Sequence, residues 1–256
     1  MILFVKKQNL TGEDMNTFLF DLDGTLLPLR EDEFIDIYFS GLIKRIVNAN
    51  YSDKQFTKAL WTGINAMRLN SGEKTNEEAF WSVFSEKMNC DRALLEAIFL
   101  EYYKTDFVET KNSTAPTPYA ALCINVLKEK GYRLALATNP LFPQIATYQR
   151  IKWAGLNPND FLLVTTIENS FYCKPNLKYY EWVLNTIGAK PEECIMVGND
   201  IGEDMVAAHL GMRVYLLTEC LINSKDENIS LFEHGRITDL YQYILALPKK
   251  LKISNK

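Results

Sequence analysis

Histidine is scarce in this chain and no cysteines are closely paired, which removes several kinds of active site. Only two histidines occur among 256 residues, and neither His209 nor His234 lies in one of the acidic loops. Zinc hydrolases and serine-histidine-aspartate triads need imidazole at the site, so both are disfavoured. The five cysteines are odd in number and scattered, with no Cys-x-x-Cys pair. We therefore expect neither a disulfide framework nor a zinc site, and infer a reduced, cytoplasmic compartment.

Long apolar runs and extended basic patches are absent as well. The chain starts Met-Ile-Leu-Phe-Val-Lys-Lys. This apolar stretch is too short for the apolar region of a signal peptide, and its charges follow the apolar residues instead of preceding them. We expect no membrane-spanning stretch anywhere in the sequence. Lysine and arginine total 28 against 32 acids, a net charge of −4, and only the tail at 249–256 is strongly basic, which we interpret as a solvated terminus. We expect no nucleic-acid or membrane partner. The sequence leaves the oligomeric state open.

An apolar segment that ends in two aspartates is the most informative part of the sequence. Residues 18–27 read Phe-Leu-Phe-Asp-Leu-Asp-Gly-Thr-Leu-Leu, which predicts a strand followed by a turn at Gly24. At such a turn, Asp21 and Asp23 can both address a ligand beyond the end of the strand, and a pair of carboxylates suits a divalent cation. The competing interpretation is a polar turn in which Asp23 caps the next element.

Between residues 33 and 115 the apolar residues recur at helical spacing, which predicts an all-helical insertion. Thr75 to Glu78 predicts a capping box, Asp91 a second helix cap, and 110–118 a linker. Several aromatic residues lie in this insertion, and at helical spacing we interpret them as its own core and not as the lining of a ligand pocket: Trp61, Phe80, Trp81, Tyr102 and Tyr103.

The remainder of the chain alternates between predicted strands and helices. Strands are predicted at 132–137, 161–166, 194–197 and 213–217, and helices at 119–130, 142–153, 176–187 and, briefly, 203–210. Strands separated by helices form a parallel sheet covered on both faces. Ligands of such folds bind beyond the carboxyl ends of the strands. The expected fold class is therefore α/β, a parallel sheet with an inserted all-helical subdomain.

Polar side chains follow each of these strands. Thr138 and Asn139 follow the strand predicted at 132–137, and Lys174 lies in the loop after the strand at 161–166. Asp200 and Asp204 follow the strand at 194–197. Each loop alone also fits an ordinary turn, and Lys178 competes with its neighbour Lys174. Their placement after successive strands favours a common site. Together with Asp21 and Asp23, Asp200 gives three oxygen ligands, a set that fits Mg²⁺ better than zinc or calcium.

These groups predict phosphoryl transfer through a covalent intermediate. Asp21 is the candidate nucleophile, and Asp23 would protonate the leaving alcohol and later deprotonate water. Thr138 and Asn139 would hydrogen-bond the phosphoryl oxygens, while Lys174 offsets their charge. We expect Asp204 to orient Lys174 or a metal-bound water.

In order along the chain, these segments resemble the four motifs of the haloacid dehalogenase superfamily of phosphohydrolases. The first motif, Asp-x-Asp-Gly-Thr, matches 21–25, and the second, a Thr or Ser that closes a strand, matches Thr138. The third, a Lys often followed by Pro, matches Lys174, and the fourth, an acidic motif, matches 198–204. The resemblance spans essentially the whole chain.

The resemblance implies a Rossmann-like core over 1–28 and 117–256 and a helical cap over 29–116. Relatives that attack carbon lack an acid at the position of Asp23, so the resemblance implies a phosphate ester as substrate. The segment at 28–31 departs from the pattern of phosphoglycolate phosphatases and sugar-phosphate mutases, which leaves the substrate open. We predict a magnesium-dependent phosphomonoesterase acting on a small phosphorylated metabolite. The alternatives are a phosphotransferase or phosphomutase, or a non-catalytic protein that binds metal or phosphate.

Overall fold

The computed structural model describes residues 15–250, and its centre is a parallel sheet of five strands in the order β2-β1-β3-β4-β5. The strands are β1 (Thr17–Phe20), β2 (Arg133–Leu136), β3 (Cys194–Gly198), β4 (Arg213–Leu217) and β5 (Glu233–Gly235). In the register of the sheet, Phe20 lies opposite Leu136 and Val197. The neighbouring strands β2, β1 and β3 therefore end at one level, and the loops that follow them meet at one edge.

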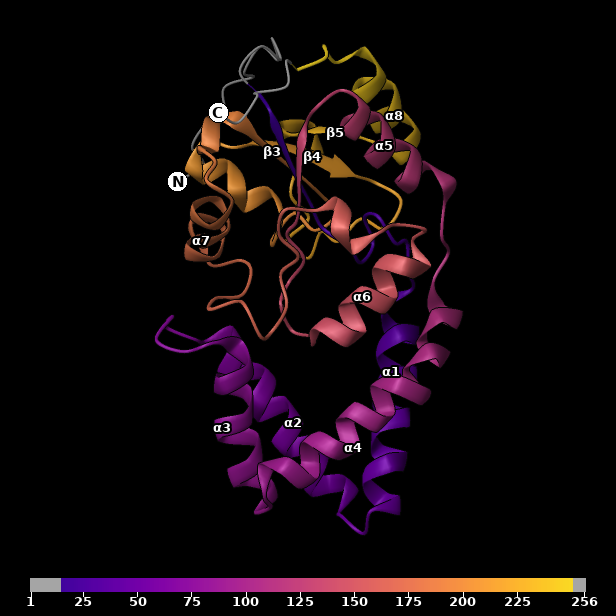
Figure 1. Cartoon of the computed structure of the whole chain (residues 1–256), viewed down its shortest axis with the longest axis vertical. Coiled ribbons are helices and arrows are strands. Elements are labelled where there is room, and N and C mark those ends of the chain that lie inside the picture. The colour runs from indigo at the N-terminus through magenta and orange to yellow at the C-terminus, as the bar shows by residue number, and fades with distance from the viewer. Residues whose placement is uncertain (1–14, 251–256) are drawn as a thin grey trace.

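Helices cover both faces of the sheet (Figure 1). They are α5 (Pro118–Glu129), α6 (Gln144–Trp153), α7 (Leu177–Ile187) and α8 (Ile237–Ala246), with short 3-10 helices η2 (Pro158–Asp160), η3 (Pro191–Glu193), η4 (Met205–Leu210) and η5 (Ile229–Leu231). Successive strand residues point to opposite faces. Phe18 and Phe20 pack in a cluster with α5 and α8, whereas Leu19 packs in another with α7 and η4. Because both faces are buried, β3 is apolar throughout and β1 is apolar apart from Thr17.

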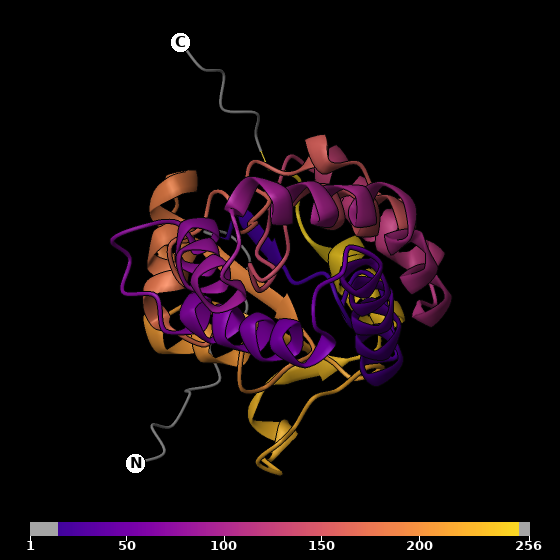
Figure 2. The same cartoon turned by 90° about the horizontal axis from the view of Figure 1, so that it is seen from below.

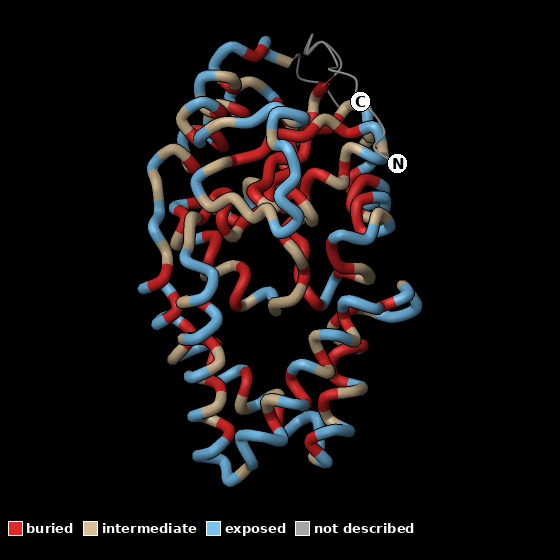
Figure 3. Tube along the Cα trace, turned by 180° about the vertical axis from the view of Figure 1, so that it is seen from behind, coloured by how far each residue is buried: buried red, intermediate tan, exposed pale blue. Residues whose placement is uncertain are grey.

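A helical insertion lies on the side of the sheet where the strands end (Figures 1 and 2). It contains α1 (Glu31–Asn48), α2 (Asp53–Arg68), α3 (Asn76–Met88), α4 (Arg92–Thr105) and the 3-10 helix η1 (Phe107–Ser113). Buried and exposed positions alternate along these helices (Figure 3). The insertion has its own buried cluster, which also takes in Ala146, Ile167 and Cys173 from the sheet side.

The aromatic residues of the insertion divide into two groups. Phe80, Trp81, Tyr102 and Tyr103 are buried in the cluster, as predicted. Phe80, Trp81 and Tyr103 also line a cavity between the insertion and the sheet edge, so the prediction that they line no pocket was wrong for these three. Trp61 is not, because it is 50% exposed, so its assignment to the core was wrong. It stacks on Phe39 at 5.2 Å between ring centroids.

Two helix caps confirm the sequence prediction. Thr75 and Glu78 form a capping box at the start of α3, in which the Thr75 amide donates to the Glu78 carboxylate at 2.8 Å. The Asp91 carboxylate accepts from the amide of Ala93 at 2.7 Å at the start of α4. Each cap satisfies amides that have no partner within the helix.

The strand predicted at 161–166 is reduced to a single parallel bridge between Leu136 and Val164. The segment does run beside β2, since the amide of Leu136 donates to Leu163 at 2.8 Å and that of Thr165 donates to Leu136 at 3.0 Å. Pairing stops at Thr166, whose amide turns to the side chain of Asn169 at 2.9 Å. The local Asx-type bond competes with continued pairing and ends the strand.

Other boundaries also differ from the prediction. Half of the linker predicted at 110–118 belongs to η1, where the Thr110 and Ser113 hydroxyls bond back to carbonyls three residues earlier. The helix predicted at 203–210 is the 3-10 helix η4, and α7 begins after Pro175, with Asn176 as its cap. The sequence analysis did not predict β5 and α8. Residues 1–14 and most of the basic tail lie outside the described residues.

None of the helices between residues 15 and 250 is both long and apolar enough to cross a membrane.

Leu19→Ala tests how much of the stability depends on the central strand. Leu19 is fully buried in β1, so removing its side chain should lower the free energy of unfolding by about 2–5 kcal/mol. Leu162→Ala is the matched control, because Leu162 is 59% exposed and its loss should change stability by less than about 0.5 kcal/mol. Urea unfolding measures both, and equal effects would contradict the assignment.

Candidate active site

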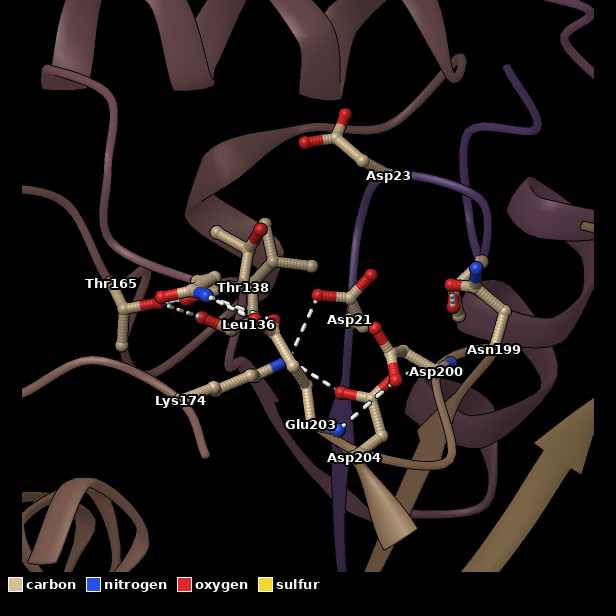
Figure 4. A network of polar contacts seen from close by, with 12 residues as sticks. Asp21, Asp23, Leu136, Thr138, Thr165, Lys174, Asn199, Asp200, Glu203 and Asp204 are labelled. Atoms are coloured by element: carbon tan, nitrogen blue, oxygen red, sulfur yellow. Dashed lines mark hydrogen bonds and ion pairs between the residues drawn. The ribbon is translucent and has the colours of Figure 1, made fainter. Parts of the chain in front are cut away.

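The edge at which β1 and β3 end gathers acidic side chains around one lysine (Figure 4). Asp21 directly follows β1, and its amide donates to the carbonyl of Val197 in β3 at 2.9 Å. Asp200 and Asp204 come from the loop that follows β3, and Lys174 comes from the loop before α7. The sheet register thus brings together residues separated by more than 150 positions in the chain.

Lys174 holds two of these acids in place. Its ammonium donates to Asp21 Oδ1 at 2.9 Å and to Asp204 Oδ1 at 2.6 Å, and all three residues are buried. Burial alone would lower the pKa of Lys174, but the carboxylates of Asp204 and Asp21 outweigh it, so this pKa is raised well above its usual value. The lysine therefore remains charged at neutral pH.

Two glycines permit the close contacts that shape these loops. Gly24 has φ +79°, and a Cβ there would collide with the side-chain amide nitrogen of Asn199. A Cβ on Gly198 would lie 2.1 Å from Asp204 Oδ2. Thr25 reinforces the first contact, since its hydroxyl donates to Asn199 Oδ1 at 2.8 Å. The loops after β1 and β3 are therefore fixed to each other.

Asp200 is held by backbone amides through one oxygen. Its Oδ1 accepts from the amides of Gly202 at 2.7 Å and Glu203 at 3.1 Å. Its own amide donates to Asp204 Oδ2 at 3.0 Å, so Asp204 holds both the lysine and the Asp200 loop. The carboxylate of Asp200 is therefore positioned before any ligand binds.

The site carries more carboxylates than Lys174 can balance. Burial raises the pKa of Asp21 from 3.8 to about 8, against the opposing effect of Lys174, and raises the pKa of Glu203 to about 7. Burial also raises the pKa of Asp200. Carboxyl groups that are costly to ionise are stabilised as carboxylates by a bound cation. Hard oxygen ligands fit Mg²⁺, with Asp21 and Asp200 as the side chains that would hold it and water or substrate oxygens completing the shell.

Asp23 does not join this group, so the three-carboxylate metal set predicted from the sequence is not assembled by side chains. Its carboxylate points away from Asp21 (Figure 4) and forms an ion pair with Arg150 of α6. Within residues 15–250, no three His, Cys, Asp or Glu side chains are grouped to hold a metal ion. Oδ1 of Asp23 is buried and has no hydrogen-bond partner among the described residues.

Thr138 and Asn139 lie at the same edge. The carbonyl of Thr138 accepts from the hydroxyls of Thr165 at 2.6 Å and Tyr179 at 2.9 Å, which fixes the loop after β2. The side-chain amide nitrogen of Asn139 donates to both carboxylate oxygens of Glu203, at 3.0 and 2.8 Å. Lys178 is not part of this group, since its ammonium lies over the ring of Tyr172.

Three further residues of the site, Arg150, Glu203 and Tyr179, were not predicted from the sequence. Arg150 is 1% exposed and lies 4.3 Å from the ring centroid of Phe142. Its position could have been found, because Ala146 and Arg150 are four residues apart on the buried face of α6. Glu203 lies within the acidic motif at 198–204 but is not one of the aspartates that define it, and no short motif marks Tyr179. The roles of both depend on packing between distant loops.

One cavity of about 1050 Å³ joins these groups to the helical insertion. Its lining includes the site acids together with both residues of the β2 loop: Asp21, Asp23, Thr138, Asn139, Asp200 and Asp204. Its other walls come from α1, α2, α3 and α4. A ligand that touches the acids is therefore also in reach of the insertion.

Comparison with known proteins identifies the family. The model of the haloacid dehalogenase-like hydrolases matches residues 15–210. Glyceraldehyde 3-phosphate phosphatase of Methanothermobacter thermautotrophicus is 29% identical over 58% of this chain, a match that spans 62% of that protein. The enzyme of the same name from Methanocaldococcus jannaschii is 24% identical over 90% of this chain and 97% of its own. Pyrophosphatase PpaX of Halalkalibacterium halodurans is 23% identical over 78% of this chain and 82% of its own.

Solved structures share the fold. A haloacid dehalogenase-type phosphatase from Thermococcus onnurineus superimposes with a TM-score of 0.58 at 20% identity, over 92% of this chain and all of that one. YfnB of Bacillus subtilis, whose structure was solved with magnesium bound, gives 0.54 at 20% identity over 91% of this chain and all of its own. At this identity the likeness shows the fold alone.

Lys174→Met tests the central ion pairs. Removing the ammonium leaves two buried acids without a counter-charge, so the free energy of unfolding should fall by about 3–5 kcal/mol. Without the cation the folded-state pKa of Asp21 lies further above its unfolded value, so the loss should be larger at pH 8 than at pH 5.

The control is Lys128→Met, which breaks a surface ion pair with Asp160 and should cost about 0–1 kcal/mol. Denaturant unfolding at both pH values measures the two variants. A Lys174→Met variant as stable as the control would contradict the interpretation.

Proposed function

The chain belongs to the haloacid dehalogenase-like hydrolases and is a phosphatase of that family, and we propose that it hydrolyses small-molecule phosphomonoesters with Mg²⁺ through a covalent phosphoryl group on Asp21. The observation that supports this most strongly is the buried Lys174, which holds Asp21 and Asp204 at the strand ends beside Asp200. A carboxylate fixed by one oxygen keeps the other for attack on phosphorus.

Two steps complete the reaction. In the first, an oxygen of Asp21 bonds to phosphorus, the bond between phosphorus and the ester oxygen breaks, and Asp23 gives the leaving alcohol a proton. In the second, water attacks the phosphorus and loses a proton to Asp23, the bond to Asp21 breaks, and phosphate leaves. Mg²⁺ bound by Asp21 and Asp200 would supply positive charge to the phosphoryl oxygens.

The surroundings of Asp23 support its role as acid and base. Arg150 holds one carboxylate oxygen, the other has no hydrogen-bond partner among the described residues, and Asp23 lines the cavity. A proton-transfer group needs this combination of a fixed orientation and one free oxygen. Asp23 therefore serves the leaving group, and the metal depends on Asp21 and Asp200.

Thr138, Asn139 and Lys174 are proposed to bind the phosphoryl group. Thr138 and Asn139 line the cavity, and Lys174 is bonded to the nucleophile. Donors fixed in advance stabilise charge that grows in the transition state. Asp204 orients Lys174 and does not contact substrate in this scheme.

We assign residues 29–116 to a cap, because they form a buried cluster of their own across the cavity from the acids. A cap of this kind excludes water from the reaction and contacts the leaving group. All five cysteines are free thiols, which supports the proposed cytoplasmic location.

Asp21→Asn tests the nucleophile. The variant should fold normally and lose at least a thousandfold in phosphate release, because an amide cannot form the phosphoryl intermediate. The assay is release of phosphate in ¹⁸O-labelled water, with Mg²⁺ or with a chelator, and the labelled oxygen should appear in the product. Asp226→Asn, in an exposed loop, is the matched control. Full activity of Asp21→Asn would refute the mechanism, and unlabelled phosphate would point to transfer to another acceptor.

Asp23→Asn tests the acid and base. With p-nitrophenyl phosphate the first step needs no proton, so the variant should release a burst of nitrophenol close to the enzyme concentration and then turn over slowly. With an alkyl phosphate there should be no burst, and the rate should fall about 10²–10⁴-fold. Stopped-flow absorbance and phosphate assays give the two results. Equal losses on both substrates, without a burst, would contradict the assignment.

A further inference from the structure

The cavity that holds the acids extends far beyond the space that a phosphoryl group needs. Its volume is about 1050 Å³, at the upper end of the range of about 300–1,000 Å³ that is usual for organic ligands. The additional space lies between the sheet edge and the helical insertion. Whatever fills it belongs to the leaving group.

Apolar side chains line that additional space. Ile35 and Phe39 come from α1, Ile64 and Trp61 from α2, and Leu100 from α4. Trp61 is 50% exposed, Leu100 46% and Ile35 36%. Large apolar side chains left open toward a cavity mark a binding surface, because their burial would be favourable.

Trp61, Ile35 and Leu100 are not part of the core that holds the insertion together, whereas Phe39 and Ile64 pack against its edge. Its core is already formed by rings such as Phe56, Phe84 and Phe99, which contact one another at centroid distances of 5.5 to 6.1 Å. Trp61 lies outside that core and stacks on Phe39. The open ring of Trp61 is therefore free to pack against a ligand.

The charges of the cavity disfavour one class of leaving group. Ten acids and two arginines line it, and one of the arginines, Arg30, forms an ion pair with Glu33. Six of the acids are paired with cations, and four have no ion pair among the described residues: Glu31, Glu168, Asp200 and Glu203. With one cation and the phosphoryl group at the metal site, a second phosphate or a carboxylate would face an excess of negative charge. Sugar bisphosphates and diphosphates are therefore poor fits.

Building on the proposed function, we propose that the substrate is a monoester of a bulky apolar alcohol, whose hydrocarbon part packs against Phe39, Trp61 and Ile64 while its phosphoryl group lies at Asp21. The size of the cavity, its apolar lining and its negative charge all favour this class of ester over small polar metabolites. The apolar group also displaces water from the space above the acids, which strengthens their interactions with the phosphoryl group.

Matched pairs of esters test this proposal, since each pair has equal leaving-group reactivity and differs in apolar size. 1-Naphthyl phosphate is compared with phenyl phosphate, and dodecyl phosphate with ethyl phosphate. At about 0.8 kcal/mol for each buried methylene, kcat/KM should be at least tenfold higher for the larger member of each pair. Preference within only one pair identifies an aryl or an alkyl group as the natural one.

Trp61→Ala should reduce the naphthyl-to-phenyl ratio of kcat/KM about tenfold, and Trp61→Phe should restore part of it. Leu69→Ala is the control, because Leu69 is at the end of the same helix, is 74% exposed and does not line the cavity. Circular dichroism and thermal unfolding verify that each variant is folded. If Trp61→Ala leaves the naphthyl-to-phenyl ratio of kcat/KM unchanged, the proposal that Trp61 contacts the apolar part of the substrate is wrong.

Binding to the Asp21→Asn variant gives a readout without turnover. Calorimetric titration should show 1-naphthyl phosphate binding at least tenfold more tightly than phenyl phosphate. If Asp21-dependent release occurs but both pairs give ratios near one, the substrate class is wrong and the proposed function stands. If no ester is hydrolysed and 1-naphthyl phosphate binds no more tightly than phenyl phosphate, the substrate class and the proposed function are both wrong.

Discussion

The candidate site depends on the ion pairs of one buried lysine. Lys174 is charged because Asp21 and Asp204 surround it, and the two acids are tolerated in the interior because Lys174 pairs with them. Asp204 in turn accepts from the amide of Asp200, so the same cluster sets the loop that follows β3. The three chain segments cannot shift independently without leaving a buried charge unpaired. This constraint would hold Asp21, the proposed nucleophile, and its neighbours with the precision that phosphoryl transfer requires.

A second ion pair connects the acids to the wall of the cavity. Arg150 binds Asp23 and lies against the ring of Phe142, at 4.3 Å, and near that of Phe34, at 5.9 Å. Phe34 belongs to α1 and Phe142 to the loop before α6, and both line the same cavity. The group that we propose to protonate the leaving alcohol is thus held by a residue packed against the apolar side. The contacts of Arg150 would therefore connect the proposed acid catalyst to the proposed binding site of the leaving group.

The sequence predicted the parts that depend on local pattern. Buried strands such as β3 are apolar at every position, and caps such as Asp91 need only neighbouring amides. The predictions failed where distant contacts decide. The segment at 161–166 has strand-like composition but stops pairing because Asn169 captures an amide, and Trp61 has helical spacing but faces a cavity. The site acids could be named from their position after strands, but the separation of Asp23 from Asp21 depends on Arg150, 127 residues away.

The central claim is that Asp21 carries the phosphoryl group. It is tested most directly by quenching the Asp23→Asn variant in acid during turnover of an aryl phosphate and mapping its peptides by mass spectrometry. The account predicts one added phosphoryl group on the peptide that contains Asp21, lost on treatment with hydroxylamine and absent from the Asp21→Asn variant. A phosphoryl group on another residue, or turnover without any phosphorylated peptide, would contradict it.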